Sequence, residues 1–250
     1  MKITSIIFSP TGGTRRVMDA VLGSIKADRA EINLMSRDIE NKEISVDSDS
    51  LVFIGMPSYA GRAPQTAMKR LSAIRGNNAK CVLIVTYGNR EYEDTLVEMY
   101  DGAVQCGFIP IAAVSGIAEH SIDREMAKGR PDGGDEGVLM AFGERIAEKA
   151  DSLNRLKEIP GNRPYKALAP GSNCPQADET CVNCGRCKAY CPVEAIDDDM
   201  TGNPERCISC MGCISVCTAG ARRLDDATVE RIHEFLLANC KVRKEPELFI

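Results

Sequence analysis

The sequence of 250 residues lacks several features that define large classes of protein. It has no tryptophan, only two histidines and no lysine- or arginine-rich run, and its net charge of −5 argues against a nucleic-acid partner. Its longest weakly polar stretch, residues 108–118, is far below the roughly 18 residues needed to span a membrane. The apolar run before Pro10 is too short for a secretory signal. We therefore expect a cytoplasmic protein with no membrane partner.

Cysteine, in contrast, is abundant, with 12 in the chain. In a reducing compartment such cysteines are metal ligands or catalytic thiols more often than disulfide partners. Nine of them lie in residues 174–217, whereas the first 160 residues contain only Cys81 and Cys106. The proline- and glycine-rich stretch between these regions is typical of a linker. The expected organisation is an N-terminal domain (1–158), a linker (159–175), a cysteine-rich domain (176–224), and a C-terminal helix and tail (225–250).

Eight cysteines form an internal repeat with the spacing C-x2-C-x2-C-x3-C. The first set is Cys181, Cys184, Cys187 and Cys191, and the second set is Cys207, Cys210, Cys213 and Cys217. Two-residue gaps allow one turn of backbone to aim three thiolates at three corners of an iron–sulfur cube, while the fourth ligand arrives from elsewhere. Zinc is the alternative, because cysteine quartets also bind zinc. Zinc sites usually pair two C-x2-C units across a long spacer, so the spacing favours iron–sulfur clusters.

This repeat resembles the two-cluster bacterial ferredoxins, whose pattern is C-x2-C-x2-C-x3-C-P and whose fourth cysteine ligates the other cluster. One departure is that Thr218, not proline, follows Cys217, whereas Pro192 follows Cys191. We expect Cys81, Cys106, Cys174 and Cys240 to be plain thiols. The resemblance implies that cluster one is held by Cys181, Cys184, Cys187 and Cys217, and cluster two by Cys207, Cys210, Cys213 and Cys191.

The N-terminal region alternates short apolar, β-branched runs with helical patterns such as "TRRVMDAVLGSI". This alternation predicts a doubly wound α/β domain with a five-stranded parallel sheet. Only residues 36–50, between the second and third strands, lack a convincing helix. The expected strands are residues 2–8, 30–35, 51–56, 80–88 and 107–115.

Ligands of such sheets bind at the carboxyl ends of the strands. The first strand leads into "SPTGGT", which offers hydroxyls, glycines and a helix N-terminus suited to a phosphate. It is neither a Walker P-loop nor a G-x-G-x-x-G turn, and an ordinary strand-to-helix turn is the alternative interpretation. The third and fourth strands lead into "PSYAGRAP" and "TYGNREYED", where aromatic, glycine and backbone groups suit a flat heterocycle.

These loops make the N-terminal domain resemble a flavodoxin, and the whole chain resembles a family of fused flavodoxin–ferredoxin proteins of anaerobes. The stretch "AEHS" at residues 118–121 is also similar to that family. His120 either touches the flavin edge or makes local hydrogen bonds, and no function is inferred for His233. The resemblance implies FMN and two [4Fe-4S] clusters. It assigns the phosphate to Ser9, Thr11, Gly12, Gly13 and Thr14, and the ring and ribityl chain to Ser58, Tyr59, Ala60, Gly61, Thr86, Tyr87, Gly88, Asn89 and Tyr92.

The combination of cofactors predicts an electron-transfer protein with a separate redox partner protein. A flavin accepts electrons singly and releases them in pairs, whereas each cluster passes one at a time. No nicotinamide-binding fingerprint is present. Two alternatives stay open: a flavin-dependent reductase of a small substrate, and a redox-sensing interaction module. The sequence leaves open whether the protein is an enzyme.

Overall fold

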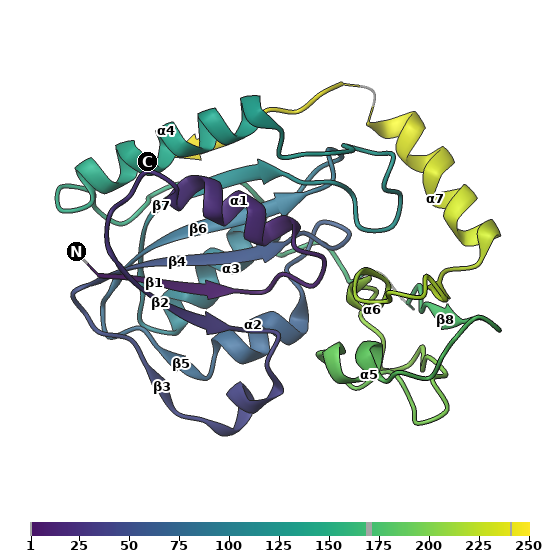
Figure 1. Ribbon diagram of the computed structural model, residues 1–250. Coiled ribbons are helices and arrows are strands. Elements are labelled where there is room, and N and C mark those ends of the chain that lie inside the picture. Colours follow the sequence, from purple (N-terminus) through teal and green to yellow (C-terminus); the bar gives the residue numbers. More distant parts are fainter. Residues whose placement is uncertain (1, 169–171, 241) are drawn as a thin grey trace.

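The computed structural model describes residues 2–168, 172–240 and 242–250, and its centre is a sheet whose strands point toward the cysteine-rich region (Figure 1). Five strands are parallel: β1 (Lys2–Ile7), β2 (Asp28–Asn33), β4 (Ser50–Pro57), β6 (Lys80–Tyr87) and β7 (Ile109–Ile117). They lie in the order β2-β1-β4-β6-β7. Renumbered along the chain this order is 2-1-3-4-5, the flavodoxin-like arrangement. The predicted doubly wound fold is confirmed.

The crossover between β2 and β4 has no α-helix, in agreement with the weak pattern of residues 36–50. It contains the 3-10 helix η1 (Arg37–Asn41) and the short strand β3 (Ile44–Ser45). β3 pairs in parallel with β5 (Ile74–Arg75) beside the main sheet. This segment is therefore packed although it has no helical periodicity.

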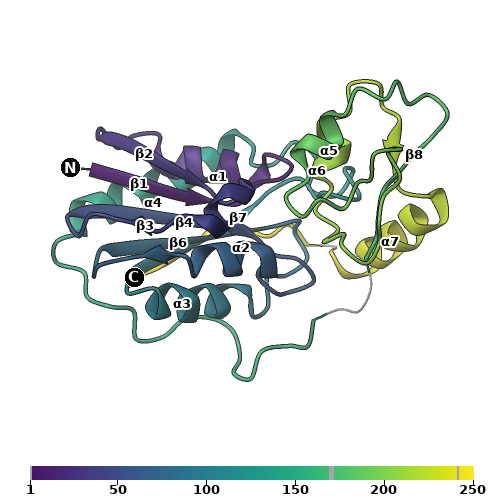
Figure 2. The same ribbon diagram turned by 90° about the horizontal axis from the view of Figure 1, so that it is seen from below.

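Helices cover both faces of the sheet. On one face lie α1 (Gly13–Leu22) and α4 (Gly133–Lys149), and on the other lie α2 (Gln65–Leu71) and α3 (Thr95–Gln105) (Figure 2). Val17 and Val21 are fully buried on the first face, and Leu71 and Met99 on the second. Burial on both faces explains why β1, β4, β6 and β7 are nearly continuous apolar runs, whereas the edge strand β2 is largely exposed.

The last strand of the sheet comes from the C-terminal tail, for which the sequence pattern predicts no strand. β10 (Glu247–Phe249) pairs antiparallel with β7, so the sheet has six strands among the described residues, not five. A three-residue strand is too short to show a period of its own. It is held by a neighbour that is far away in the sequence.

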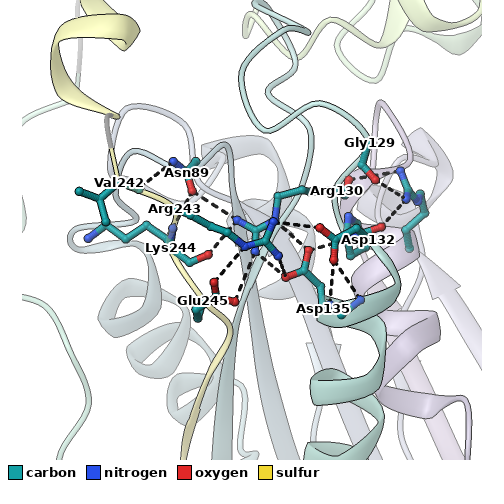
Figure 3. Close-up of polar contacts among 12 residues, drawn as sticks. Asn89, Gly129, Arg130, Asp132, Asp135, Val242, Arg243, Lys244 and Glu245 are labelled. Carbon is teal, nitrogen blue, oxygen red and sulfur yellow. Dashed lines mark hydrogen bonds and ion pairs between the residues drawn. The ribbon is translucent and has the colours of Figure 1, made fainter.

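A network of polar contacts holds the tail on the N-terminal domain (Figure 3). The amide of Asn89 donates to the carbonyl of Val242 at 3.0 Å and accepts from the backbone N–H of Lys244 at 2.9 Å. Arg130 donates to the carbonyl of Lys244 at 2.8 Å. Arg243 forms ion pairs with the carboxylates at the start of α4, Asp132 at 2.9 Å and Asp135 at 3.0 Å.

The expected linker, residues 159–175, contacts the N-terminal domain where the structure describes it. The carboxylate of Asp94, before α3, accepts from the backbone N–H groups of Asn162 at 2.8 Å and Lys166 at 2.7 Å. Arg163 pairs with Asp101 of α3 at 2.6 Å. The described part of this segment therefore packs along α3.

The cysteine-rich region contains four short elements and one longer helix. β8 (Gln176–Ala177) pairs antiparallel with β9 (Arg222–Arg223), and α5 (Arg186–Tyr190) and α6 (Gly212–Ser215) lie within the two cysteine runs. α7 (Asp226–Asn239) leads back toward the sheet, as Figure 1 shows. None of the described helices is long and apolar enough to cross a membrane.

Direct hydrogen bonds join the cysteine-rich region to the N-terminal domain. Tyr190 and Ser215 both donate to the carbonyl of Pro10, at 3.0 and 3.2 Å. The buried guanidinium of Arg70 donates to the carbonyl of Pro192 at 2.6 Å. The two regions are therefore packed against each other at the carboxyl ends of the strands.

Candidate functional site

A cavity of about 740 Å³ lies where the two regions meet. We call it the strand-end cavity. Its walls come from the loops after β1, β4, β6 and β7, and from residues 207–209 of the second cysteine run. Cavities of this size are typical of sites for small molecules and cofactors.

Most of the residues assigned to FMN line this cavity. They are Ser9, Thr11, Gly13, Thr14, Ser58, Tyr59, Ala60, Thr86, Tyr87 and Gly88. Gly12, Gly61, Asn89 and Tyr92 belong to the same assignment but are not among the lining residues. The structure therefore brings the three predicted loops together, but four of the residues assigned to the flavin do not line the cavity.

The first loop combines a left-handed turn with close packing. Gly12 has φ of +86°, which favours glycine. A Cβ at Gly13 would lie 2.9 Å from the Cβ of Ala118, so this glycine lets the loop after β7 approach. Ser9 accepts from the backbone N–H of Arg15 at 3.0 Å, and the Thr14 and Thr86 hydroxyls lie 2.7 Å apart. Thr11 has no such internal contact among the described residues, and it lines the cavity.

Asn89 and Tyr92 contact the C-terminal tail. Asn89 is buried and makes the hydrogen bonds to the tail that are described above. The Tyr92 hydroxyl donates to the carboxylate of Glu247 in β10 at 3.4 Å, and its ring meets that of Tyr87 edge-on at 5.3 Å. The tail strand has no local sequence signal, so the sequence predicts flavin contacts for both side chains and gives no indication of their contacts with the tail.

The glycines of the loops after β4 and β6 make room for neighbouring side chains. Gly61 has φ of +85°, and a Cβ there would overlap the carboxylate of Glu93. A Cβ at Gly88 would lie 2.4 Å from the ring of His120. These glycines shape the loops through packing inside the protein.

His120 lines the cavity and makes the local hydrogen bonds that one of its two interpretations expects. Its Nδ1 accepts from the backbone N–H groups of Ile122 at 3.3 Å and Asp123 at 3.1 Å. Burial lowers the pKa of His120 below its ordinary value, although Asp123 opposes this. With Nδ1 as an acceptor, the neutral ring carries its proton on Nε2.

The four cysteines assigned to cluster one surround a small hollow, which we call the Cys181 hollow. Cys181, Cys184 and Cys187 line it together with Cys217 from the second run. Cys184 is exposed, whereas Cys187 is buried. The fold thus carries the fourth cysteine of the second run to the first three of the other run.

The remaining set gathers closer to the strand-end cavity. Burial raises the pKa of the Cys210 and Cys213 thiols to about 12, and nearby Cys191 and Cys207 add to this. At Cys213 the guanidinium of Arg222 opposes the rise. Because a cluster binds thiolates, its insertion must release these protons. Cys207 also lines the strand-end cavity, so this set adjoins the candidate flavin site.

Thr218, the departure from the ferredoxin pattern, has a partner of its own. Its hydroxyl accepts from Arg186 of the first run at 2.9 Å. The two runs are therefore linked at the position where proline was expected.

The cysteines outside the repeat differ in their surroundings. Cys81 is fully buried in β6, Cys240 is buried at the end of α7, and Cys106 donates to the carbonyl of Leu71 at 3.3 Å. Cys174 lies beside Cys207, and burial raises its pKa to about 12. Among the described residues, no group of three or more histidines, cysteines or acidic residues is placed so that it could hold a single metal ion.

Several residues of the strand-end cavity were missed by the sequence analysis. Ile208 and Ser209, between two predicted cluster ligands, face the cavity, and Ile208 packs against the apolar core of the N-terminal domain. Arg231 of α7 also lines it. The repeat identifies Ile208 as the counterpart of Val182, but Val182 is 70% exposed. The spacing alone contains no signal that separates the two.

Comparison with protein families identifies the cysteine runs. Residues 178–197 and 204–220 each match the 4Fe-4S binding domain. The C-terminal region carries two [4Fe-4S]-binding motifs. These motifs indicate a role in electron transfer. No match was found among curated proteins.

Solved flavodoxins align with the N-terminal part of the chain. An archaeal flavodoxin is 14% identical, with a TM-score of 0.41, over 60% of this chain and 99% of its own. Flavodoxin 1 from Bacillus cereus is 12% identical, with a TM-score of 0.40, over 59% of this chain and 98% of its own. The corresponding values for a Streptococcus pneumoniae flavodoxin are 15%, 0.37, 59% and 97%.

The residues of the strand-end cavity fit a flavin mononucleotide. The volume suits a cofactor, and the cavity opens at the switch point of the sheet, where such folds bind FMN. Its first loop leads into the N-terminus of α1, a ten-residue helix that offers N–H groups and a dipole to a phosphate. Tyr59 and Tyr87 supply aromatic surface beside it.

Proposed function

We propose that this protein transfers electrons between its two iron–sulfur clusters and an FMN in the strand-end cavity, and onward to a redox partner protein. One observation carries the proposal: residues 207–209 of the second cysteine run form a wall of the cavity built by the three strand-end loops. The bound flavin supplies both one-electron and two-electron chemistry.

The chain positions the second cysteine run beside the cavity. Ile208 anchors the second cysteine run on the core of the N-terminal domain, and Cys207 lies on the cavity wall. Tyr59 lines the cavity and lies near Cys210 of the cluster-two set. Cluster two is therefore the one that faces the flavin, whereas the exposed Cys184 of cluster one is open to a partner.

The chain also limits access to the site. The packed loops, the ring of His120 and the cysteine-rich region enclose the cavity from several sides. A partner protein then meets the outer cysteine set more easily than the flavin. This supports electron transfer through the clusters.

The first experiment is the visible spectrum of anaerobically purified full-length protein before and after reduction, with the released flavin identified. The proposal expects FMN and two [4Fe-4S] clusters. A colourless protein that contains zinc would overturn it.

The second experiment compares Ile208→Ser with Val182→Ser, which occupies the matching position of the first run. After photochemical reduction of the clusters, flavin reduction is expected to be first order and independent of protein concentration. Ile208→Ser should slow it severalfold because the second run loses its anchor, while Val182→Ser should not. Equal rates in both variants, with intact cofactors, would contradict the proposed path through cluster two.

A further inference from the structure

Arg222 of β9 is a buried cation in the cysteine-rich region, and the electron path described above does not use it. Its side chain is 2% exposed. Within residues 2–168, 172–240 and 242–250, no carboxylate pairs with it. An unpaired charge in such a place is strongly unfavourable, so a negatively charged group is expected beside it.

The contacts of Arg222 point toward the clusters. It donates to the carbonyls of Pro175 at 2.9 Å and Met200 at 2.7 Å, which fix the guanidinium. Its Nη2 also approaches the Sγ of Cys187 at 3.5 Å. The side chain lines the Cys181 hollow together with Cys184 and Cys217.

One donor of this guanidinium lacks an acceptor. Arg222 Nε and Ser24 Oγ are the buried side-chain polar atoms without a hydrogen-bond partner in the described part of the chain. Leaving a buried donor without a partner costs about 1–3 kcal/mol, so such atoms usually mark a missing acceptor. Sulfur atoms of a cluster in the Cys181 hollow are acceptors of the required charge.

We propose that Arg222 donates hydrogen bonds to the sulfur atoms of cluster one and raises its reduction potential. Reduction adds one electron to the cluster, and a fixed cation stabilises the added negative charge. Hydrogen bonds to sulfur and local charge are among the factors that set cluster potentials. The inference rests on the clusters of the proposed function, but it does not depend on the flavin.

The direct sulfur contact of Arg222 is to Cys187 of the cluster-one set. We therefore expect the larger effect at cluster one. A higher potential there would make the exposed cluster the better acceptor for an electron that arrives from a partner.

The test is a redox titration of the full-length protein, monitored by the paramagnetic signals of the reduced clusters. Arg222→Met should move one midpoint potential to a more negative value, and Arg222→Lys, which keeps the charge but loses donors, should move it less. The control is Arg223→Met in the same strand, because Arg223 is 63% exposed and pairs with Asp178 at 3.1 Å. Surface charge is screened by salt, so this variant should leave both potentials unchanged.

A second measurement uses the wild-type protein and therefore does not depend on whether a variant folds. In wild-type protein grown with ¹⁵N-arginine, pulsed paramagnetic spectra of the reduced clusters should show coupling to an arginine nitrogen. Absence of that coupling, or equal potentials in Arg222→Met and wild type, would overturn the role of Arg222. Absence of clusters from wild-type protein would instead contradict the proposed function.

Discussion

At the scale of single residues, contacts inside the protein explain several of the residue types found in the strand-end loops. Gly88 leaves room for His120, and the Thr14 hydroxyl lies 2.7 Å from that of Thr86. Thr11, in contrast, lines the cavity without such a contact among the described residues. A side chain that faces a cavity from a loop is the better candidate for direct contact with a ligand.

We predict that Thr11→Ala weakens FMN binding about tenfold or more. The substitution removes one hydroxyl donor to a charged phosphate, and a hydrogen bond to a charged group is worth about 1.5–3 kcal/mol. The measurement is a fluorescence titration of flavin-free protein with FMN. Thr66→Ala, a threonine of α2 that does not line the cavity, serves as the control. If both variants retain wild-type affinity and fold normally, the phosphate does not contact Thr11.

At the scale of elements, the two cysteine runs exchange their fourth members. Cys217 lines the Cys181 hollow, although Cys191 is nearer to that hollow in sequence. Cys191 instead lies near Cys210 and Cys213. The Arg186–Thr218 hydrogen bond joins the runs at the crossing. Each run is therefore part of the site of the other.

This exchange predicts the result of removing either fourth cysteine. Cys191→Ala should damage the cluster held by Cys207, Cys210 and Cys213, because that cluster would lose its fourth thiolate. Cys217→Ala should damage the other cluster. Paramagnetic spectra of partially reduced variants distinguish the two. Perturbation of only the cluster of the same run in each variant would show that the runs bind independently.

At the scale of the whole molecule, the chain connects its two regions twice. It leaves the N-terminal domain along α3, where Arg163 pairs with Asp101, and it returns through α7, where His233 lies 2.8 Å from Asp123. It then ends in β10 on the edge of the sheet. A linker alone would permit many relative positions. The return of the chain restricts them, and this restriction keeps the second cysteine run on the strand-end cavity.

We predict that Asn89→Ala releases the tail from the N-terminal domain. It leaves the Lys244 N–H and the Val242 carbonyl without their partner, which costs about 1–3 kcal/mol of the free energy of unfolding. Urea unfolding of the full chain and hydrogen exchange of the β10 amides measure the effect. Asn239→Ala is the control, since Asn239 is exposed and donates within its own helix at 2.7 Å. Unchanged β10 protection in Asn89→Ala would rule out this anchor.

The sequence by itself determined the features that depend on local patterns. The cysteine spacing identified two cluster motifs, because ligand geometry constrains neighbouring residues directly. Four of the five parallel strands followed from apolar runs, because burial on both faces of a sheet leaves a continuous signal, whereas the edge strand β2 is largely exposed. The three loops at the strand ends then followed from the position of the strands.

Only the tertiary structure decided which of those residues meet one another. Val182 and Ile208 occupy the same place in the repeat, yet one is exposed and the other packs on the N-terminal core. Asn89 binds the tail because β10 pairs with β7, and Arg222 is buried because β9 pairs with β8. These contacts join segments far apart in the sequence, and their free energy comes from long-range packing, which leaves no periodic trace in either segment.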